Sequence, residues 1–174
     1  MPVVLIVFFV LALLFRIGTL VISIRHERRL KNNGAIEYGA TNSIALAFSH
    51  LLFYLFVALE GWMQRSSPDL LTWSGFVLYA LSAAFLVAVI HLLGRVWTVK
   101  LLIARDHVLV DHGLFRIVNP PNYFLNILPE LIGLALGLHA YFTLVIGLPL
   151  YLIPLSIRIR EEERIMRLRF HNYS

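Results

Sequence analysis

The chain has 174 residues, of which 59% are hydrophobic and 14% are charged. Soluble domains average about 45–50% apolar and about 25% charged residues, so this composition argues against a soluble globular protein and excludes a disordered one. A net charge of +5 in so apolar a chain indicates contact with anionic lipid surfaces rather than nucleic acid.

Apolar stretches long enough to cross a bilayer follow one another along the chain. A membrane-spanning helix needs roughly 20 apolar residues. The first stretch has no basic segment before it, so we expect a retained anchor rather than a cleaved signal peptide. The sequence predicts an all-α integral membrane protein with one domain and about five spans, at residues 3–24, 44–63, 70–93, 123–138 and 140–157.

The last two spans come from one long apolar stretch, 117–157, whose single formal charge is Glu130. As one helix it would measure about 60 Å, roughly twice the thickness of the hydrocarbon core. We therefore divide it near Gly137-Leu138-His139 into a helical hairpin. Prolines predict kinks in both arms, at Pro129, Pro149 and Pro154.

Basic residues support an odd number of spans. Of the 15 Lys and Arg residues, four lie in 25–31, four in 94–122 and five in 158–174, and five spans place all three segments on one side. The positive-inside rule makes that side cytoplasmic and the N-terminus external, in what we expect to be a bacterial inner membrane. The segments 94–122 and 158–174 flank the hairpin, so we expect a site built from both at the cytoplasmic lipid boundary.

Two motifs flank the hairpin. Residues 107–123 read HVLVDHGLFRIVNPPNY, and residues 158–166 read RIREEERIM and are followed by Phe170-His171. In this order and at this separation they resemble the two halves of the signature of the isoprenylcysteine carboxyl methyltransferase family, which includes phospholipid methyltransferases. The chain departs from the signature at Asn119-Pro120-Pro121 (Arg-His-Pro in the family), at Phe115 (Tyr) and at His171 (Gly).

The N-terminal part is similar to a narrower bacterial branch of this family. The resemblance rests on residues 23–30 and 34–39, in the first cytoplasmic loop. Members of that branch often accompany polyketide synthases, and some methylate hydroxyls of alkylpyrones or alkylated phenols. The resemblance therefore covers nearly the whole chain.

The resemblance implies S-adenosyl-L-methionine as the cofactor, in a cytoplasmic pocket made by 107–123 and 158–170. It gives Arg158 and Glu163 as the catalytic pair. We expect Arg158 to orient an oxygen nucleophile or anchor a carboxylate, and Glu163 to accept a hydrogen bond from cofactor or substrate. The implied cofactor-binding residues are His107, Val108, Leu109, Val110, Gly113, Leu114, Phe115, Asn119, Pro120, Pro121, Tyr123 and Glu162.

Helical geometry and the cost of buried charge add expectations of their own. On a helix Arg158 shares a face with Glu161 or Glu162 but not with Glu163. Glu130 is costly in a bilayer and must face the bundle interior, where it either contacts the substrate or cofactor or bonds a neighbouring helix. We expect Arg16 to pair with an interior acid or to snorkel, and Glu60 to have a structural role.

These features predict methylation of a lipophilic small molecule that enters from the bilayer between the third, fourth and fifth spans. O-methylation of a hydroxyl or carboxylate is the first choice. Three alternatives stay open: a phospholipid N-methyltransferase, a reductase related to membrane sterol reductases that uses a nicotinamide cofactor, and a non-catalytic accessory protein. With no cysteine and no HxxxH pair, we expect no metal site. Membrane lipids are the expected surroundings, and the sequence does not indicate the oligomeric state.

Overall fold

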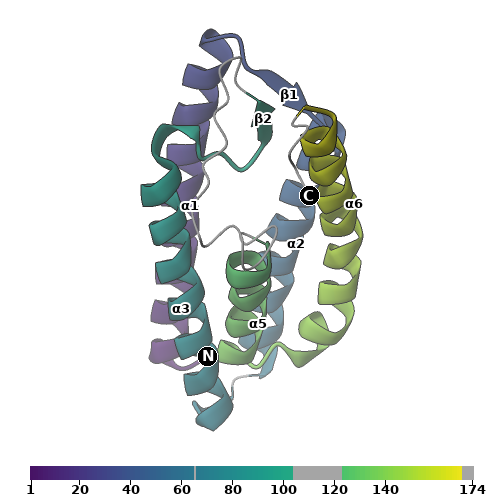
Figure 1. Cartoon of the computed structure of the whole chain (residues 1–174). Helices are drawn as coiled ribbons and strands as arrows, with labels where there is room; N and C mark the ends of the chain where they lie inside the picture. Colours follow the sequence, from purple (N-terminus) through teal and green to yellow (C-terminus); the bar gives the residue numbers. More distant parts are fainter. Residues whose placement is uncertain (65, 104–122, 170–174) are drawn as a thin grey trace.

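The computed structural model describes residues 1–64, 66–103 and 123–169, which form a bundle of helices (Figure 1). The predicted cofactor residues His107–Pro121 therefore lie outside the described residues, as do Phe170 and His171. The helices are α1 (Val3–Asn32), α2 (Ala40–Gln64), α3 (Leu70–Leu93), α5 (Leu128–Gly137) and α6 (Leu148–Arg169).

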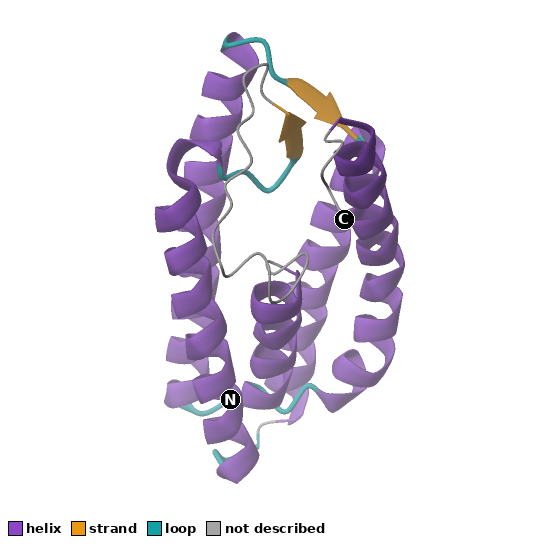
Figure 2. Cartoon of the chain, viewed as in Figure 1, coloured by secondary structure: helices purple, strands orange, loops and turns teal. Residues whose placement is uncertain are grey.

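Short elements complete the described fold. A 3-10 turn, Gly94–Val96, follows α3, and π-helical turns precede α5 and α6 at Tyr123–Ile127 and Thr143–Gly147. Two strands, β1 (Ile36–Tyr38) and β2 (Leu101–Ile103), pair antiparallel with Ile36 opposite Ile103 (Figure 2). The all-α prediction holds for the bundle, but the strands were not predicted, because three residues are too few to show an alternating pattern.

Four helices among the described residues are long and apolar enough to cross a membrane: Val3–Asn32, Ala40–Gln64, Leu70–Val96 and Thr143–Ile165. They correspond to four of the five expected spans. The other one, Tyr123–Gly137, is shorter, about 22 Å at 1.5 Å per residue against a hydrocarbon core of about 30 Å. The count of five therefore stays a prediction.

The first helix is longer than the predicted span 3–24, since α1 continues to Asn32. Hydropathy marks where apolar residues end, but it does not mark where a helix ends. The extension is rich in Arg, Glu, Leu and Lys, which favour helix, and Lys31 pairs with Glu27 one turn earlier. The basic segment is thus a helical extension beyond the apolar part of α1, rather than a loop.

The hairpin lies where the sequence analysis placed it. Helix α5 ends at Gly137, and the chain reverses through His139, which has a positive φ of 58°. The carboxylate of Glu60 caps the second arm by accepting hydrogen bonds from the backbone N–H groups of Phe142 and Thr143, at 2.8 and 2.7 Å. Glu60 thus has a structural contact of the kind the sequence analysis expected.

Both π-helical turns lie immediately before a helix that carries proline at its second residue. A proline cannot donate to the carbonyl four residues earlier, and its ring crowds that carbonyl. A wider π turn relieves this crowding. Pro129 and Pro149 follow these turns, while Pro154 lies inside α6.

Helices α3 and α5 pack with their backbones in contact. A Cβ atom added at Gly133 would lie 2.6 Å from the backbone N of Tyr79, and one added at Gly75 would collide with the backbone N of Gly137. No ligand can pass between backbones this close. This contact closes α3 against α5 at the level of Gly75 and Gly133. The substrate entrance expected between the third, fourth and fifth spans stays a prediction.

Substituting Gly75 tests this contact. Gly75→Ala must push α3 from α5, and overpacking of this kind costs about 1–3 kcal/mol of unfolding free energy. Gly18→Ala is the matched control, because nothing lies within 4 Å of a Cβ added to Gly18. Unfolding by SDS in mixed micelles measures both variants. Equal stability of the two variants would contradict the backbone contact.

Candidate functional site

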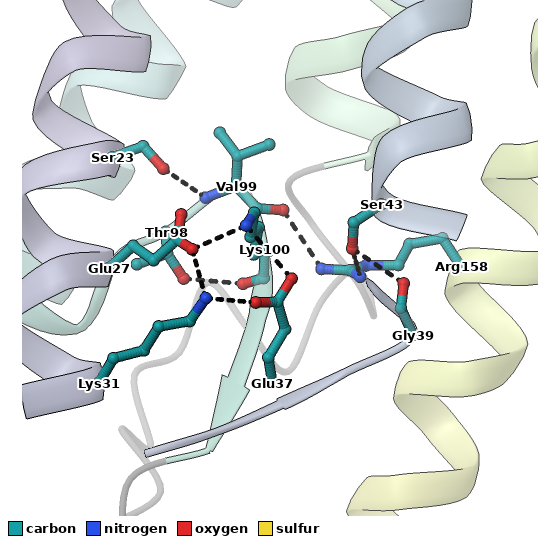
Figure 3. Close-up of polar contacts among 10 residues, drawn as sticks. All are labelled: Ser23, Glu27, Lys31, Glu37, Gly39, Ser43, Thr98, Val99, Lys100 and Arg158. Atoms are coloured by element: carbon teal, nitrogen blue, oxygen red, sulfur yellow. Dashed lines mark hydrogen bonds and ion pairs between the residues drawn. The ribbon is translucent and has the colours of Figure 1, made fainter. Parts of the chain in front are cut away.

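Arg158 is buried near the two strands, with 2% of its surface exposed (Figure 3). Its Nη1 donates to Ser43 Oγ at 2.8 Å, and its Nη2 donates to the carbonyl of Val99 at 3.2 Å (Figure 3). Its Nε donates to the hydroxyl of Tyr123 at 3.4 Å. One guanidinium therefore joins α6 to α2, to the chain entering β2 and to the start of the hairpin.

Tyr123 links Arg158 to a carboxylate. Its hydroxyl donates to Glu162 Oε2 at 2.7 Å. Glu162 lies one helical turn after Arg158, so both side chains reach the same tyrosine, as the shared helix face predicted. The structure thus brings together three of the site residues predicted from the sequence.

Glu163 lies apart from this group. It is half-buried, and within the described part of the chain it makes no hydrogen bond or ion pair. Its position five residues after Arg158 turns it to another side of α6. The catalytic role of Glu163 stays a prediction from the resemblance.

The carboxylate of Glu161 lies against Gly39. Gly39 has a φ of 61°, and a Cβ added to it would collide with Glu161 Oε2. That oxygen is buried and has no hydrogen-bond partner among the described residues. A buried acceptor three residues after Arg158 is therefore left for a donor that the described chain does not supply.

A network of two carboxylates and two lysines supports this end of the bundle (Figure 3). Lys31 and Lys100 both reach Glu27 Oε1 at 2.7 Å. They also reach Glu37, with Lys31 at 2.5 Å and Lys100 at 3.3 Å. The hydrogen bond from Lys31 holds the pKa of Glu37 below its usual value, so this carboxylate stays ionised at neutral pH.

The network ties β1, through Glu37, and the residue before β2, Lys100, to α1. Two further hydrogen bonds to α1 come from the residues just before Lys100. The backbone N–H of Val99 donates to Ser23 Oγ at 2.9 Å, and His26 Nδ1 lies 2.9 Å from the carbonyl of Trp97. The sequence offered one signal for the network, the spacing of Glu27 and Lys31. The other two members, Glu37 and Lys100, are brought near this pair only by the fold.

A second polar cluster lies in the apolar part of the bundle. Glu130 is 2% exposed, and its Oε2 pairs with Arg16 Nη1 at 3.2 Å. Tyr54 donates to Glu130 Oε1 at 2.5 Å, and His50 Nε2 lies 3.6 Å from the same oxygen. Glu130 therefore faces the interior and pairs with Arg16, as expected of charges in a bilayer.

Comparison with known proteins decides the family. A model of the isoprenylcysteine carboxyl methyltransferase (ICMT) family matches residues 75–168, more than half of the chain. The chain belongs to the ICMT family. The match includes Arg158, Tyr123, Glu162 and Glu130. Membership of the ICMT family indicates a membrane methyltransferase.

Two relatives match almost the whole chain. An uncharacterized protein of Haemophilus influenzae is 42% identical over 158 residues, covering 91% of this chain and 92% of its own. The uncharacterized protein YpbQ of Bacillus subtilis is 28% identical over 153 residues, covering 87% and 90%. No solved structure matches the chain.

ICMT-family members use S-adenosylmethionine, and the described residues suit the polar groups of that molecule. Its carboxylate fits a guanidinium such as that of Arg158, because arginine binds carboxylates with two parallel donors. Its amino group and ribose hydroxyls need acceptors, which Glu162 and the unpartnered Oε2 of Glu161 offer. The described residues therefore include charged and polar groups of the kinds that the cofactor needs.

The pair of Arg16 and Glu130 allows a double-mutant test. Glu130→Gln leaves the partly buried Arg16 without a counter-charge, which costs up to about 3–5 kcal/mol of unfolding free energy. Arg16→Met leaves the buried Glu130 without a counter-charge in the same way. The double variant removes both charges, so we expect it to lose clearly less than the sum of the single losses. SDS unfolding provides the measurement, and strictly additive losses would contradict the pairing.

Proposed function

We propose that this chain is an S-adenosyl-L-methionine-dependent methyltransferase that acts on a lipophilic small molecule at the membrane surface. The observation that carries the proposal is the buried group of Arg158, Tyr123 and Glu162 within the segment that matches the ICMT family. A buried arginine that joins three segments is costly, and a ligand-binding role accounts for that cost. We place this end of the bundle at the cytoplasmic face of a bacterial inner membrane.

The bound cofactor supplies an activated methyl group. The chain has to hold the acceptor atom in line with it and exclude water, and positioning alone is worth several kcal/mol. We propose that Arg158 anchors the carboxylate of the cofactor beside the acceptor oxygen. Glu162 and Glu161 accept hydrogen bonds from the cofactor, and residues of the segment 107–121 provide its apolar walls.

An oxygen acceptor of low pKa suits this site best. A neutral aliphatic alcohol needs a general base. In the described part of the site, Glu162 already accepts a hydrogen bond from the Tyr123 hydroxyl, and we assign Glu161 to the cofactor, so neither carboxylate is left to act as this base. A phenolic or enolic hydroxyl ionises near neutral pH and needs little help. We therefore propose O-methylation of a phenol, a pyrone or a similar polyketide, as in the bacterial branch that the sequence resembles.

Binding of S-adenosylhomocysteine tests the cofactor site. Calorimetry on the detergent-purified chain should show micromolar affinity. Arg158→Gln should weaken it at least tenfold, since a lost charge-assisted hydrogen bond costs about 1.5–3 kcal/mol. Arg160→Gln is the matched control, an exposed arginine two residues away, and it should bind like wild type.

Two results would contradict the proposal. The first is no binding by a folded, monodisperse wild-type sample, which would favour a non-catalytic accessory protein. The second is equal binding by the Arg158 and Arg160 variants, which would place the cofactor elsewhere.

Glu163→Gln tests the residue assigned by resemblance alone. We expect this variant to lower methyl transfer from labelled cofactor to a lipid extract while it leaves stability within about 0.5 kcal/mol, because Glu163 has no described partner to lose. Methyl transfer at the wild-type rate would remove Glu163 from the site. The labelled product also separates O-methylation from N-methylation of phospholipids.

A further inference from the structure

A cavity of about 210 Å³ lies between α1 and α2, apart from the close contact of α3 and α5. Its apolar wall includes Ile17 and Leu20 of α1 and Leu46 and Leu51 of α2. Three of these, Ile17, Leu20 and Leu51, are 48%, 49% and 64% exposed, so the cavity opens sideways between the two helices. In a membrane this opening faces lipid.

One end of the cavity reaches the Arg158 site. Ser43 and Val99 line the cavity, and both accept hydrogen bonds from the Arg158 guanidinium. Arg16, His50, Tyr54 and Tyr151 also line it. On α2, Ser43 and His50 are seven residues apart, which places the two polar regions roughly 10 Å from each other along the helix.

Arg16, His50, Tyr54 and Tyr151 form the inner polar wall of the cavity. This wall is electrically neutral when His50 is neutral, because Arg16 is already paired with Glu130. A charged ligand group placed there would be left without a counter-charge in a medium of low dielectric constant, which is costly. A neutral group that forms hydrogen bonds has no such cost. The wall therefore selects a hydroxyl or carbonyl rather than a charged group.

This wall also has spare hydrogen-bonding capacity. His50 Nε2 faces Glu130 Oε1 at 3.6 Å, and His50 Nδ1 lies 3.3 Å from the Tyr151 hydroxyl. The nearby carboxylate of Glu130 favours the tautomer with hydrogen on Nε2, in which Tyr151 donates to Nδ1. The oxygen of Tyr151 is then left to accept a hydrogen bond. Glu130 itself does not line the cavity, so it is a positioning residue for Arg16 and His50.

We propose that this cavity binds the body of the methyl acceptor, and that the acceptor carries a second, neutral hydroxyl roughly 10 Å from the reacting oxygen. The role in methyl transfer rests on the function proposed above. A cavity of about 150 Å³ already takes up benzene, so this one holds a ring-sized part of the ligand while the remainder extends into lipid. The acyl chain of a phospholipid would leave the inner polar wall without a partner.

Binding of tritiated 5-pentylresorcinol, a neutral phenol whose hydroxyl can meet the inner polar wall while its alkyl tail extends toward lipid, tests the cavity and this wall. The chain is held in lipid nanodiscs without cofactor, and excess unlabelled probe defines saturable binding over empty nanodiscs. Ala47 lines the cavity, so Ala47→Phe fills it and should weaken binding at least about tenfold. Ala45→Phe is the matched control, because Ala45 lies on the same helix, is exposed and does not line the cavity.

A second variant tests the polar wall. Tyr151→Phe keeps the ring and removes one hydroxyl, which should weaken probe binding roughly three- to tenfold. Pentylbenzene, which has no hydroxyl, should displace the probe at least about tenfold less well. Thermal unfolding confirms that each variant is folded.

Three results would overturn the inference. They are no saturable binding by wild type, equal effects of Ala47→Phe and Ala45→Phe, and equal displacement by pentylbenzene. S-adenosylhomocysteine binding, measured on the same samples, separates this inference from the proposed function. If the chain binds the cofactor but not the probe, only the proposal that the cavity binds the acceptor is contradicted. If it binds the probe but not the cofactor, the proposed methyltransferase function is contradicted.

Discussion

The need to give polar partners to every charge buried in the bundle determines much of this structure. Arg16 meets Glu130 across the bundle, and Arg158 reaches a hydroxyl of α2, a carbonyl before β2 and a hydroxyl at the start of the hairpin. Neither arginine could stay in this environment without such partners. The two groups join segments that are far apart in sequence, and one cavity has residues of the first group and partners of the second in its wall.

This arrangement gives the two ends of the cavity different chemistry. At the Arg158 end, an arginine and nearby carboxylates offer both donors and acceptors. At the Arg16 end, a neutral wall suits an uncharged polar group. In the proposed account the acceptor enters from lipid between α1 and α2, past the exposed apolar residues that line the cavity. A methyltransferase with a lipophilic acceptor accounts for both ends and for the opening between them.

Much of the fold followed from the sequence, because long apolar stretches have few structural options in a membrane. The third span matched α3 at both ends, and the hairpin turn fell at Leu138-His139. The extension of α1 was missed because hydropathy does not register a polar helix, and the strands were too short to show a pattern. Helical spacing anticipated that Arg158 and Glu162 share a face. The bonds of Arg158 to Ser43 and Val99 could not be anticipated, since they join residues 115 and 59 positions apart.

The cavity could not be predicted from the sequence, because the space between two helices depends on how they pack. The sequence had suggested an entrance between other spans. The most direct test of the account is to locate the cofactor. The chain would be photolabelled with an azidoadenine analogue of S-adenosylhomocysteine, and the labelled peptides would be mapped by mass spectrometry. We predict saturable labelling within residues 94–122 or 158–174, abolished by unlabelled S-adenosylhomocysteine and reduced in Arg158→Gln. Labelling at the opposite end, around Asp69 and His139, or no saturable labelling, would contradict the account.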